Sequence, residues 1–218
     1  HAATSALINF NDVIVVASVS CIYGIGEKEE YEKNMLILSV GQSISRNTIL
    51  NKLIDMTYER NELDFHRGTF RVRGGSIDII PVNEKSLGIR ITLDEDIVDE
   101  ISLFDPLTGA IEKSVKSITI SPASHFVTSK DKMDIAISKI EAELKNRLEE
   151  LKSENKLIEE QRLRERTNYD IEMLKETGFC NGVENYSRHL ALREAGETPS
   201  CLIDFFPKDF LLVVDESH

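Results

Sequence analysis

Residues 68–82, GTFRVRGGSIDIIPV, predict the centre of the fold, a β-hairpin. Apolar and charged side chains alternate up to Gly74 and Gly75, which can supply the positive φ angles of a two-residue turn. Such a turn pairs Arg73 with Ser76, Val72 with Ile77, Arg71 with Asp78, and Phe70 with Ile79. This register predicts a core face made of Phe70, Val72, Ile77 and Ile79, and an opposite face made of Arg71, Arg73 and Asp78. A hairpin this short needs further strands beside it.

The arginine-bearing face has two interpretations. In the simpler one it faces solvent, and Arg71 forms an ordinary cross-strand ion pair with Asp78 worth a few tenths of a kcal/mol, roughly. Composition alone favours this view. In the other it is a docking face, because arginine offers a planar fork of donors that suits carboxylate or phosphate groups. The arginines that gather in this part of the sequence are Arg60, Arg67, Arg71, Arg73 and Arg90.

The composition is that of a globular protein. The chain has 218 residues and a net charge of −12, which argues against a surface that coats nucleic acid, although a local basic site remains compatible with it. Three cysteines without CxxC spacing indicate neither a disulfide framework nor a zinc site, and they favour a reducing, cytoplasmic setting. We find no signal peptide, and the longest apolar runs are too short to span a bilayer. Both ends resemble cut edges of a longer protein.

The remaining pattern predicts two kinds of sheet and a helical region. Residues 12–17 and 210–214 are apolar without alternation, which is typical of strands buried on both faces of a parallel sheet. Between them, the pattern predicts helices over 27–39 and 45–60 and strands over 89–93, 97–104 and 113–121. Two long helices, with the second over about 156–177 and ending at Gly178, predict a helical hairpin.

Asp215 and Glu216 are the strongest local signal for chemistry. An acidic pair directly after a buried strand is the Walker B arrangement, in which the Asp holds Mg²⁺ and the Glu positions the attacking water. A solvated strand end is the alternative. The sequence contains no G-x-x-x-x-G-K-[ST] motif, so we predict that this chain does not hydrolyse ATP by itself.

Other candidate residues are less specific. The small polar residues after the first apolar run, including Ser18 and Ser20, suit a ligand-binding sheet edge and a plain strand exit equally well. Phe126 and Tyr186, with Arg166 and Arg188, could clamp a nucleic-acid strand, although aromatic residues near helices more often belong to the core. His66, His125 and His189 show no metal-ligand spacing.

Six collinear motifs closely resemble the UvrB family, the damage-verification subunit of the bacterial UvrABC excision nuclease. They are VIVVASVSCIYG, GTFRVRG, PASHFVT, QRLRERTNYD, ENYSRHL and VDESH, and the resemblance covers essentially the whole chain. It implies an α/β and α+β fold: pieces of a P-loop helicase-type parallel-sheet domain, an inserted antiparallel α+β domain and a helical domain. The implied boundaries are 1–27 and 205–218 for the helicase-type domain, 28–121 for the UvrA-binding domain and 122–204 for the helical domain.

The resemblance implies a role in nucleotide excision repair of damaged DNA. UvrA docking residues would be Arg60, Arg71, Arg73 and Arg90. Residues near the DNA path would be Ser18, Ser20, Phe126, Arg166 and Glu184. Asp215 and Glu216 match the family's Mg-ATP acids, so ATP and Mg²⁺ are expected cofactors of the full-length protein and none is expected for this chain alone.

The implied partners are UvrA and, in the full-length protein, damaged DNA and UvrC, with no membrane. Gly75 stands where the family usually has Asp, and Thr92 where it usually has Glu, which makes the face more basic. The alternative is the related UvrA-binding module of a transcription-repair coupling factor. The terminal DESH and the ENYSRH run speak against it, because that module is expected to lack an intact ATPase site.

Overall fold

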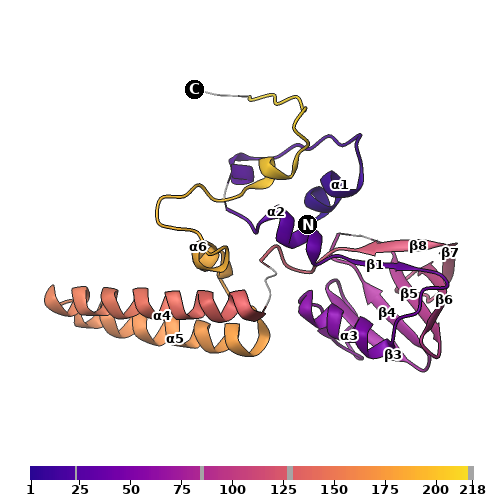
Figure 1. Ribbon diagram of the computed structural model, residues 1–218, viewed down its shortest axis with the longest axis horizontal. Helices are drawn as coiled ribbons and strands as arrows, with labels where there is room; N and C mark the ends of the chain where they lie inside the picture. The colour runs from indigo at the N-terminus through magenta and orange to yellow at the C-terminus, as the bar shows by residue number, and fades with distance from the viewer. Residues whose placement is uncertain (23, 84–85, 127–129, 216–218) are drawn as a thin grey trace.

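The structure, a computed structural model, describes residues 1–22, 24–83, 86–126 and 130–215. Figure 1 shows three regions: a sheet-rich region, a long helical hairpin that points away from it, and a smaller region to which the N-terminal and C-terminal segments both contribute. In chain order the elements are α1 (Ala2–Asn9), the 3-10 turn η1 (Val19–Ile22), α2 (Lys28–Lys33), β1 (Leu36–Ser39), α3 (Arg46–Asp55), β2 (Glu59–Arg60), β3 (Thr69–Arg73), β4 (Ser76–Ile80), β5 (Gly88–Asp94), β6 (Ile97–Phe104), β7 (Ile111–Val115), β8 (Ser117–Ile120), α4 (Lys130–Ser153), α5 (Leu157–Thr177), η2 (Val183–Tyr186), α6 (Ser187–Leu190) and η3 (Leu202–Phe205).

The sheet-rich region is built on the predicted hairpin. The six-stranded sheet has the order β2-β3-β4-β5-β6-β7, with β2 parallel to β3 and all other neighbours antiparallel. The register between β3 and β4 confirms the four predicted pairs, from Arg73 with Ser76 to Phe70 with Ile79. Gly74 has a φ of +57°, the left-handed conformation that the turn requires.

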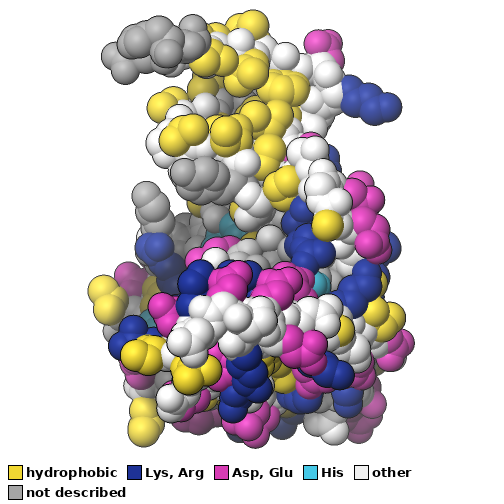
Figure 2. Space-filling model, turned by 90° about the vertical axis from the view of Figure 1, so that its left-hand side faces the viewer, with side chains coloured by type: hydrophobic (Ala, Val, Ile, Leu, Met, Phe, Trp, Pro, Cys, Tyr) yellow, Lys and Arg dark blue, Asp and Glu magenta, His cyan; other side chains and the backbone are white. Residues whose placement is uncertain are grey.

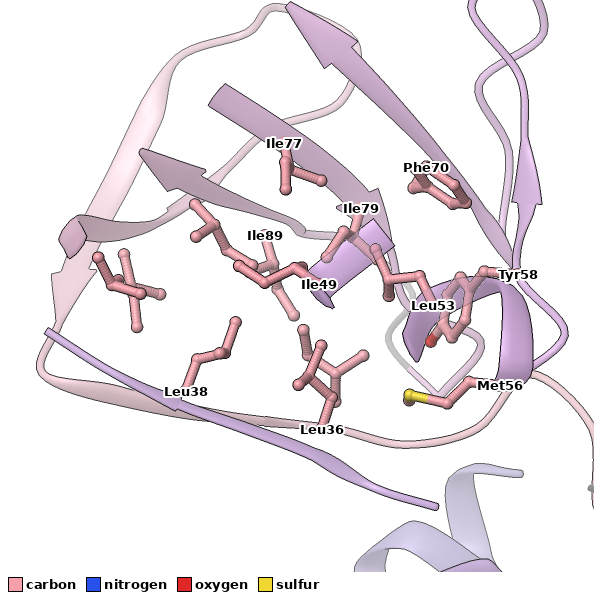
Figure 3. Close-up of a cluster of buried hydrophobic side chains, with 14 residues drawn as sticks. Leu36, Leu38, Ile49, Leu53, Met56, Tyr58, Phe70, Ile77, Ile79 and Ile89 are labelled. Atoms are coloured by element: carbon pink, nitrogen blue, oxygen red, sulfur yellow. The ribbon is translucent and has the colours of Figure 1, made fainter. Parts of the chain in front are cut away.

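The core of this region lies between the sheet and α3. Phe70, Ile77 and Ile79 are completely buried, together with Ile49 and Leu53 of α3 (Figure 3). Each such side chain contributes about 1.5–3 kcal/mol relative to an exposed position. Val72, the fourth residue of the predicted core face, is only partly buried. The α3 helix begins after Ser45, whose hydroxyl accepts a hydrogen bond from the backbone N–H of Thr48.

The helix predicted over 27–39 is wrong in its second half. The α2 helix ends at Lys33, and Leu36–Ser39 forms strand β1, paired with β8 in a two-stranded sheet. Leu36 and Leu38 are buried while Ile37 between them is 63% exposed, which is the period of a strand. A short apolar run fits the period of a helix and that of a strand equally well, so pairing with β8 decided that this segment forms a strand. The strand predicted over 113–121 is likewise divided into β7 and β8, which belong to different sheets.

The two strands predicted over 12–17 and 210–214 are not formed. Neither segment is assigned to a strand, and Ile14 and Val16 are 93% and 96% exposed. A strand buried on both faces needs neighbours on both edges, and no strand in the described part of the chain pairs with either segment. Figure 2 shows apolar side chains gathered over the upper part of the molecule, where these segments lie in Figure 1. The α+β and helical parts of the predicted fold class are confirmed.

The helical region also follows the prediction. The α4 and α5 helices pack as an antiparallel hairpin, and α6 packs against α4. The α5 helix ends at Gly178, which has a φ of 72° and whose N–H bonds to the carbonyl of Leu174. No helix in the described ranges is long and apolar enough to cross a membrane.

Candidate protein-docking face

The outer face of the six-stranded sheet carries a row of polar residues that crosses five strands. Register places Arg71, Asp78, Arg90, Ser102 and Ser114 opposite one another in turn, from β3 to β7. Residues that face each other across antiparallel strands project to the same side of the sheet. The row therefore lies on the face opposite the α3 core.

Asp78 is the centre of this row, and both of its carboxylate oxygens are occupied. Arg71 donates from Nε (3.2 Å) and Nη2 (3.1 Å) to Oδ2 of Asp78. Arg90 donates from Nε to Oδ1 at 2.7 Å and from Nη2 to Oδ2 at 3.0 Å. The predicted cross-strand ion pair of Arg71 with Asp78 is formed. The side chain of Asp78 is only 1% exposed, so the pair belongs to a buried ion triad and does not lie on the surface, as the simpler sequence interpretation expected. The hydrogen bond to Asp78 raises the pKa of Arg90, against the opposing effect of burial.

Two aromatic rings complete the setting of the arginines. The guanidinium carbon of Arg71 lies 3.9 Å from the ring centre of Phe65, and that of Arg90 lies 4.8 Å from the ring centre of Phe104. The two rings are stacked, with centres 6.4 Å apart and an angle of 6° between their planes. Gly88 makes this possible, because a Cβ at that position would lie 2.5 Å from the Phe104 ring. Ring contacts and ion pairs thus fix both guanidinium groups in place.

The four arginines predicted for docking are therefore not equivalent. The side chains of Arg71 and Arg90 are only 12% and 26% exposed. Arg73, one row further along β3, is exposed and forms no ion pair within the described residues. Arg60 lies on the edge strand β2, is paired in register with Phe70 and donates to Glu62 at 3.1 Å. Two are held by Asp78, Arg60 is paired with Glu62 at the edge, and Arg73 is open. Their role in docking stays a prediction.

The two departures from the usual family pattern lie beside Arg73. Arg73 pairs with Ser76, and Ser76 pairs in turn with Thr92. The hydroxyl oxygens of Ser76 and Thr92 lie 3.3 Å apart. Gly75 occupies the adjoining turn, and its carbonyl accepts from the N–H of Leu93. Neither Gly75 nor Thr92 offers a carboxylate to Arg73. The next residue of this row is Glu100, which pairs with Thr92 and accepts from the hydroxyl of Ser114.

The residues predicted near a DNA path fall into two places. Ser18 and Ser20 are exposed at η1 and bond to each other at 2.7 Å. Phe126 is half-buried against the core of the helical region, Arg166 is 70% exposed within 3.9 Å of Asp170, and Glu184 is exposed on η2. Burial raises the pKa of the nearby Cys180 thiol to about 11. Three of these five residues thus lie in or against the helical region.

The predicted Mg-ATP acids are not assembled into a site by the described residues. Asp215 is exposed at a bend, and Glu216 lies outside the described residues. The described ranges contain no group of three His, Cys, Asp or Glu side chains that could hold a metal ion. The residues present therefore do not fit a Mg-ATP centre by themselves, and no chemical step is derived from them.

Sequence reasoning missed the second arginine on Asp78 and both aromatic rings. The alternation of residues 89–93 correctly placed Arg90 outward, but the loop over 81–87 has no turn motif that fixes its register with β4. Gly88 opposite Phe104 was an available signal, because a glycine within a strand often marks a close approach by another group.

Matches to two known domain families identify the class of protein to which this chain belongs. Residues 36–126 match the model of the UvrB interaction domain, and residues 131–192 match that of the UvrB third helical domain. Proteins named UvrABC system protein B are similar over all 218 residues: 56% identical in Clostridium acetobutylicum, 53% in Geobacillus kaustophilus and 54% in Dehalococcoides mccartyi. This chain belongs to the UvrB family. The matched region covers 100% of this chain and 33% of the length of each of these relatives.

Proposed function

We propose that this chain acts in nucleotide excision repair as the part of a UvrB protein that docks on UvrA. The observation that supports it most is the Asp78-centred arginine row on the outer face of the domain that matches the UvrB interaction domain. The relatives carry the name UvrABC system protein B, so the coupling-factor alternative is not favoured.

The geometry suits recognition of carboxylates on a partner. Arg73 is open, and the exposed parts of Arg71 and Arg90 are held in place before the partner arrives. A side chain fixed in its bound position loses less conformational entropy on binding than a free one. Because the chain as a whole carries −12, a local positive site also orients an acidic partner toward this face. UvrA should therefore present acidic side chains to Arg73 and to the row beside it.

The test is a titration of this chain with purified UvrA at several salt concentrations. Replacing Arg73 by Ala should weaken binding by about 1–2 kcal/mol, and replacing Arg71 and Arg73 together should weaken it by at least about 2 kcal/mol. Binding should weaken as salt rises, and the Arg73→Ala variant should show a shallower salt dependence. Arg147→Ala is the matched control, since Arg147 lies half-exposed on α4. Unchanged affinity in the double variant would reject this function.

In the longer protein, the remaining candidate residues would serve DNA and ATP. We propose that Ser18, Ser20, Phe126, Arg166 and Glu184 lie near damaged DNA, and that Asp215 and Glu216 contribute to a Mg-ATP site together with a P-loop supplied elsewhere. We also propose UvrC as a partner of the longer protein. The separation of Ser18 and Ser20 from the helical group predicts two contact regions. Loss of DNA binding in the Arg166→Ala variant of the full-length protein, with Arg147→Ala unaffected, would support the helical one.

The lack of a P-loop motif predicts no ATP turnover by this chain. A phosphate-release assay on the purified chain should give the buffer rate. Turnover above that rate, abolished by Glu216→Ala, would contradict the prediction.

A further inference from the structure

Two leucines in the sheet region are almost completely exposed. Leu63 is 98% exposed and Leu107 is 95% exposed. Neither lies in the two apolar segments of the chain that lack strand neighbours: Leu63 is in the loop between β2 and β3, and Leu107 is in the loop between β6 and β7. Single exposed leucines are ordinary on protein surfaces, so what distinguishes these two is where their loops hold them.

Both leucines sit at the tips of loops that hydrogen bonds hold closed. The side-chain oxygen of Asn61 accepts from the N–H groups of Leu63 (3.1 Å) and Asp64 (2.9 Å). The carboxylate of Asp105 accepts in the same way from Leu107 (2.7 Å) and Thr108 (3.1 Å). In each loop the acceptor precedes the leucine by two residues, which is the pattern of an Asx turn. The two leucines are therefore presented on fixed backbone.

The two loops leave the sheet at the same end. Thr69, at the start of β3, pairs with Ile80 of β4, and Phe104, at the end of β6, pairs with Gly88 of the neighbouring strand β5. The ring of Phe65, in the first loop, stacks on the ring of Phe104, the last residue of β6 before the second loop, with ring centres 6.4 Å apart. Leu63 precedes Phe65 by two residues and Leu107 follows Phe104 by three, so each leucine Cα lies within about 11 Å of its ring-bearing Cα. A standard interface patch is about 30 Å across, enough to include both leucines and Arg73.

We infer that Leu63 and Leu107 are apolar anchors of the same docking face, which insert into two apolar pockets of a protein partner whose acidic side chains meet Arg73 and the arginine row. This rests on the proposed function and adds to it the chemistry of the partner surface. The arginines supply charge recognition, and the leucines supply burial of apolar area.

The experiment measures binding of this chain to UvrA for the variants Leu63→Ser, Leu107→Ser and both together. Each single change should weaken binding about tenfold, because burying a leucine is worth at least that factor. The slope of log Kd against log salt should stay that of the unaltered chain, in contrast to Arg73→Ala. Leu157→Ser is the matched control, since Leu157 is 58% exposed on α5, in the helical hairpin. Leu63→Met and Leu107→Met should keep most of the affinity.

The outcomes separate the two proposals. If the unaltered chain binds UvrA and the double serine variant binds equally well, the anchors are rejected and the docking function stands. If the unaltered chain does not bind UvrA at all, the docking function itself is rejected. A serine variant that also flattens the salt dependence, or that lowers the thermal midpoint, would overturn the anchor assignment, because the change would then act through the fold or the charges.

Discussion

Arg90 donates a 2.7 Å hydrogen bond from Nε to Oδ1 of Asp78, although a long loop separates their strands. The same carboxylate accepts from Arg71 through its other oxygen. One buried acid thus fixes two cations on a face that would otherwise be a free cluster of like charges. The Asp78-centred arginine row is a structural element first, and only the parts of Arg71 and Arg90 that stay exposed are available to a partner.

Removing this acid should destabilise the protein. We expect Asp78→Asn to lower the free energy of unfolding by about 2–3 kcal/mol, because two guanidinium groups lose their partner in a partly buried site. This is below the range for fully buried pairs, since Arg90 is 26% exposed. Urea denaturation of the two chains measures the difference. Asp99→Asn, an exposed acid on β6, should have no effect, and an equally small effect at Asp78 would contradict the assignment.

The contact between Gly88 and Phe104 should be sensitive to a single methyl group. Gly88→Ala places a Cβ 2.5 Å from the Phe104 ring and 3.1 Å from Ile80, so overpacking should cost about 1–3 kcal/mol. The matched test is the double variant Gly88→Ala with Phe104→Leu. Its thermal midpoint should fall by less than the two single shifts added together, because the smaller side chain relieves the clash. Strict additivity would mean that the two residues do not press on each other.

Acid should weaken the fold through His125. Its Nε2 lies 2.8 Å from the hydroxyl of Thr4 and its ring stacks on Tyr31, and burial lowers its pKa to about 4, with a smaller contribution from the N-terminal amine. The folded protein thus holds this ring neutral while the unfolded chain binds a proton below about pH 6.5. The free energy of unfolding should therefore fall as pH drops from about 6.5 to 4, by at most about 1.4 kcal/mol per pH unit.

The variant His125→Asn separates this effect from the titration of acids. It should reduce the slope of stability against pH between about 4 and 6.5. His66→Asn, in which an exposed histidine is replaced, should leave that slope unchanged. Identical slopes for all three chains would show that His125 has no part in the pH dependence.

The end of α5 offers a simpler prediction about backbone conformation. Gly178 has a φ of 72°, and open space surrounds the position of a Cβ, so strain alone decides the effect of a substitution. Gly178→Ala should cost about 1 kcal/mol. Gly178→Asn should cost less, because asparagine tolerates the left-handed conformation. Thermal unfolding followed by the helical signal measures both, and equal losses would argue against a conformational cause.

Sequence reasoning reached the hairpin, the helical hairpin and the composition of the arginine face. It could do so because these depend on neighbours in the chain: the turn at Gly74 and Gly75 sets the β3–β4 register, and Gly178 ends α5. It failed at Leu36–Ser39, where the period of a short apolar run is ambiguous. It also failed at the two apolar segments, whose strand state requires partners that the described residues do not provide.

The amino-acid sequence by itself determined which side chains of β3 and β4 face the core and which carry charge outward, because a two-residue turn leaves one register. Only the tertiary structure decided that Asp78 serves two arginines, that Phe65 reaches Phe104, and that Leu63 and Leu107 are left exposed. These relations join segments separated by long loops, and the path of such loops depends on packing across the whole sheet.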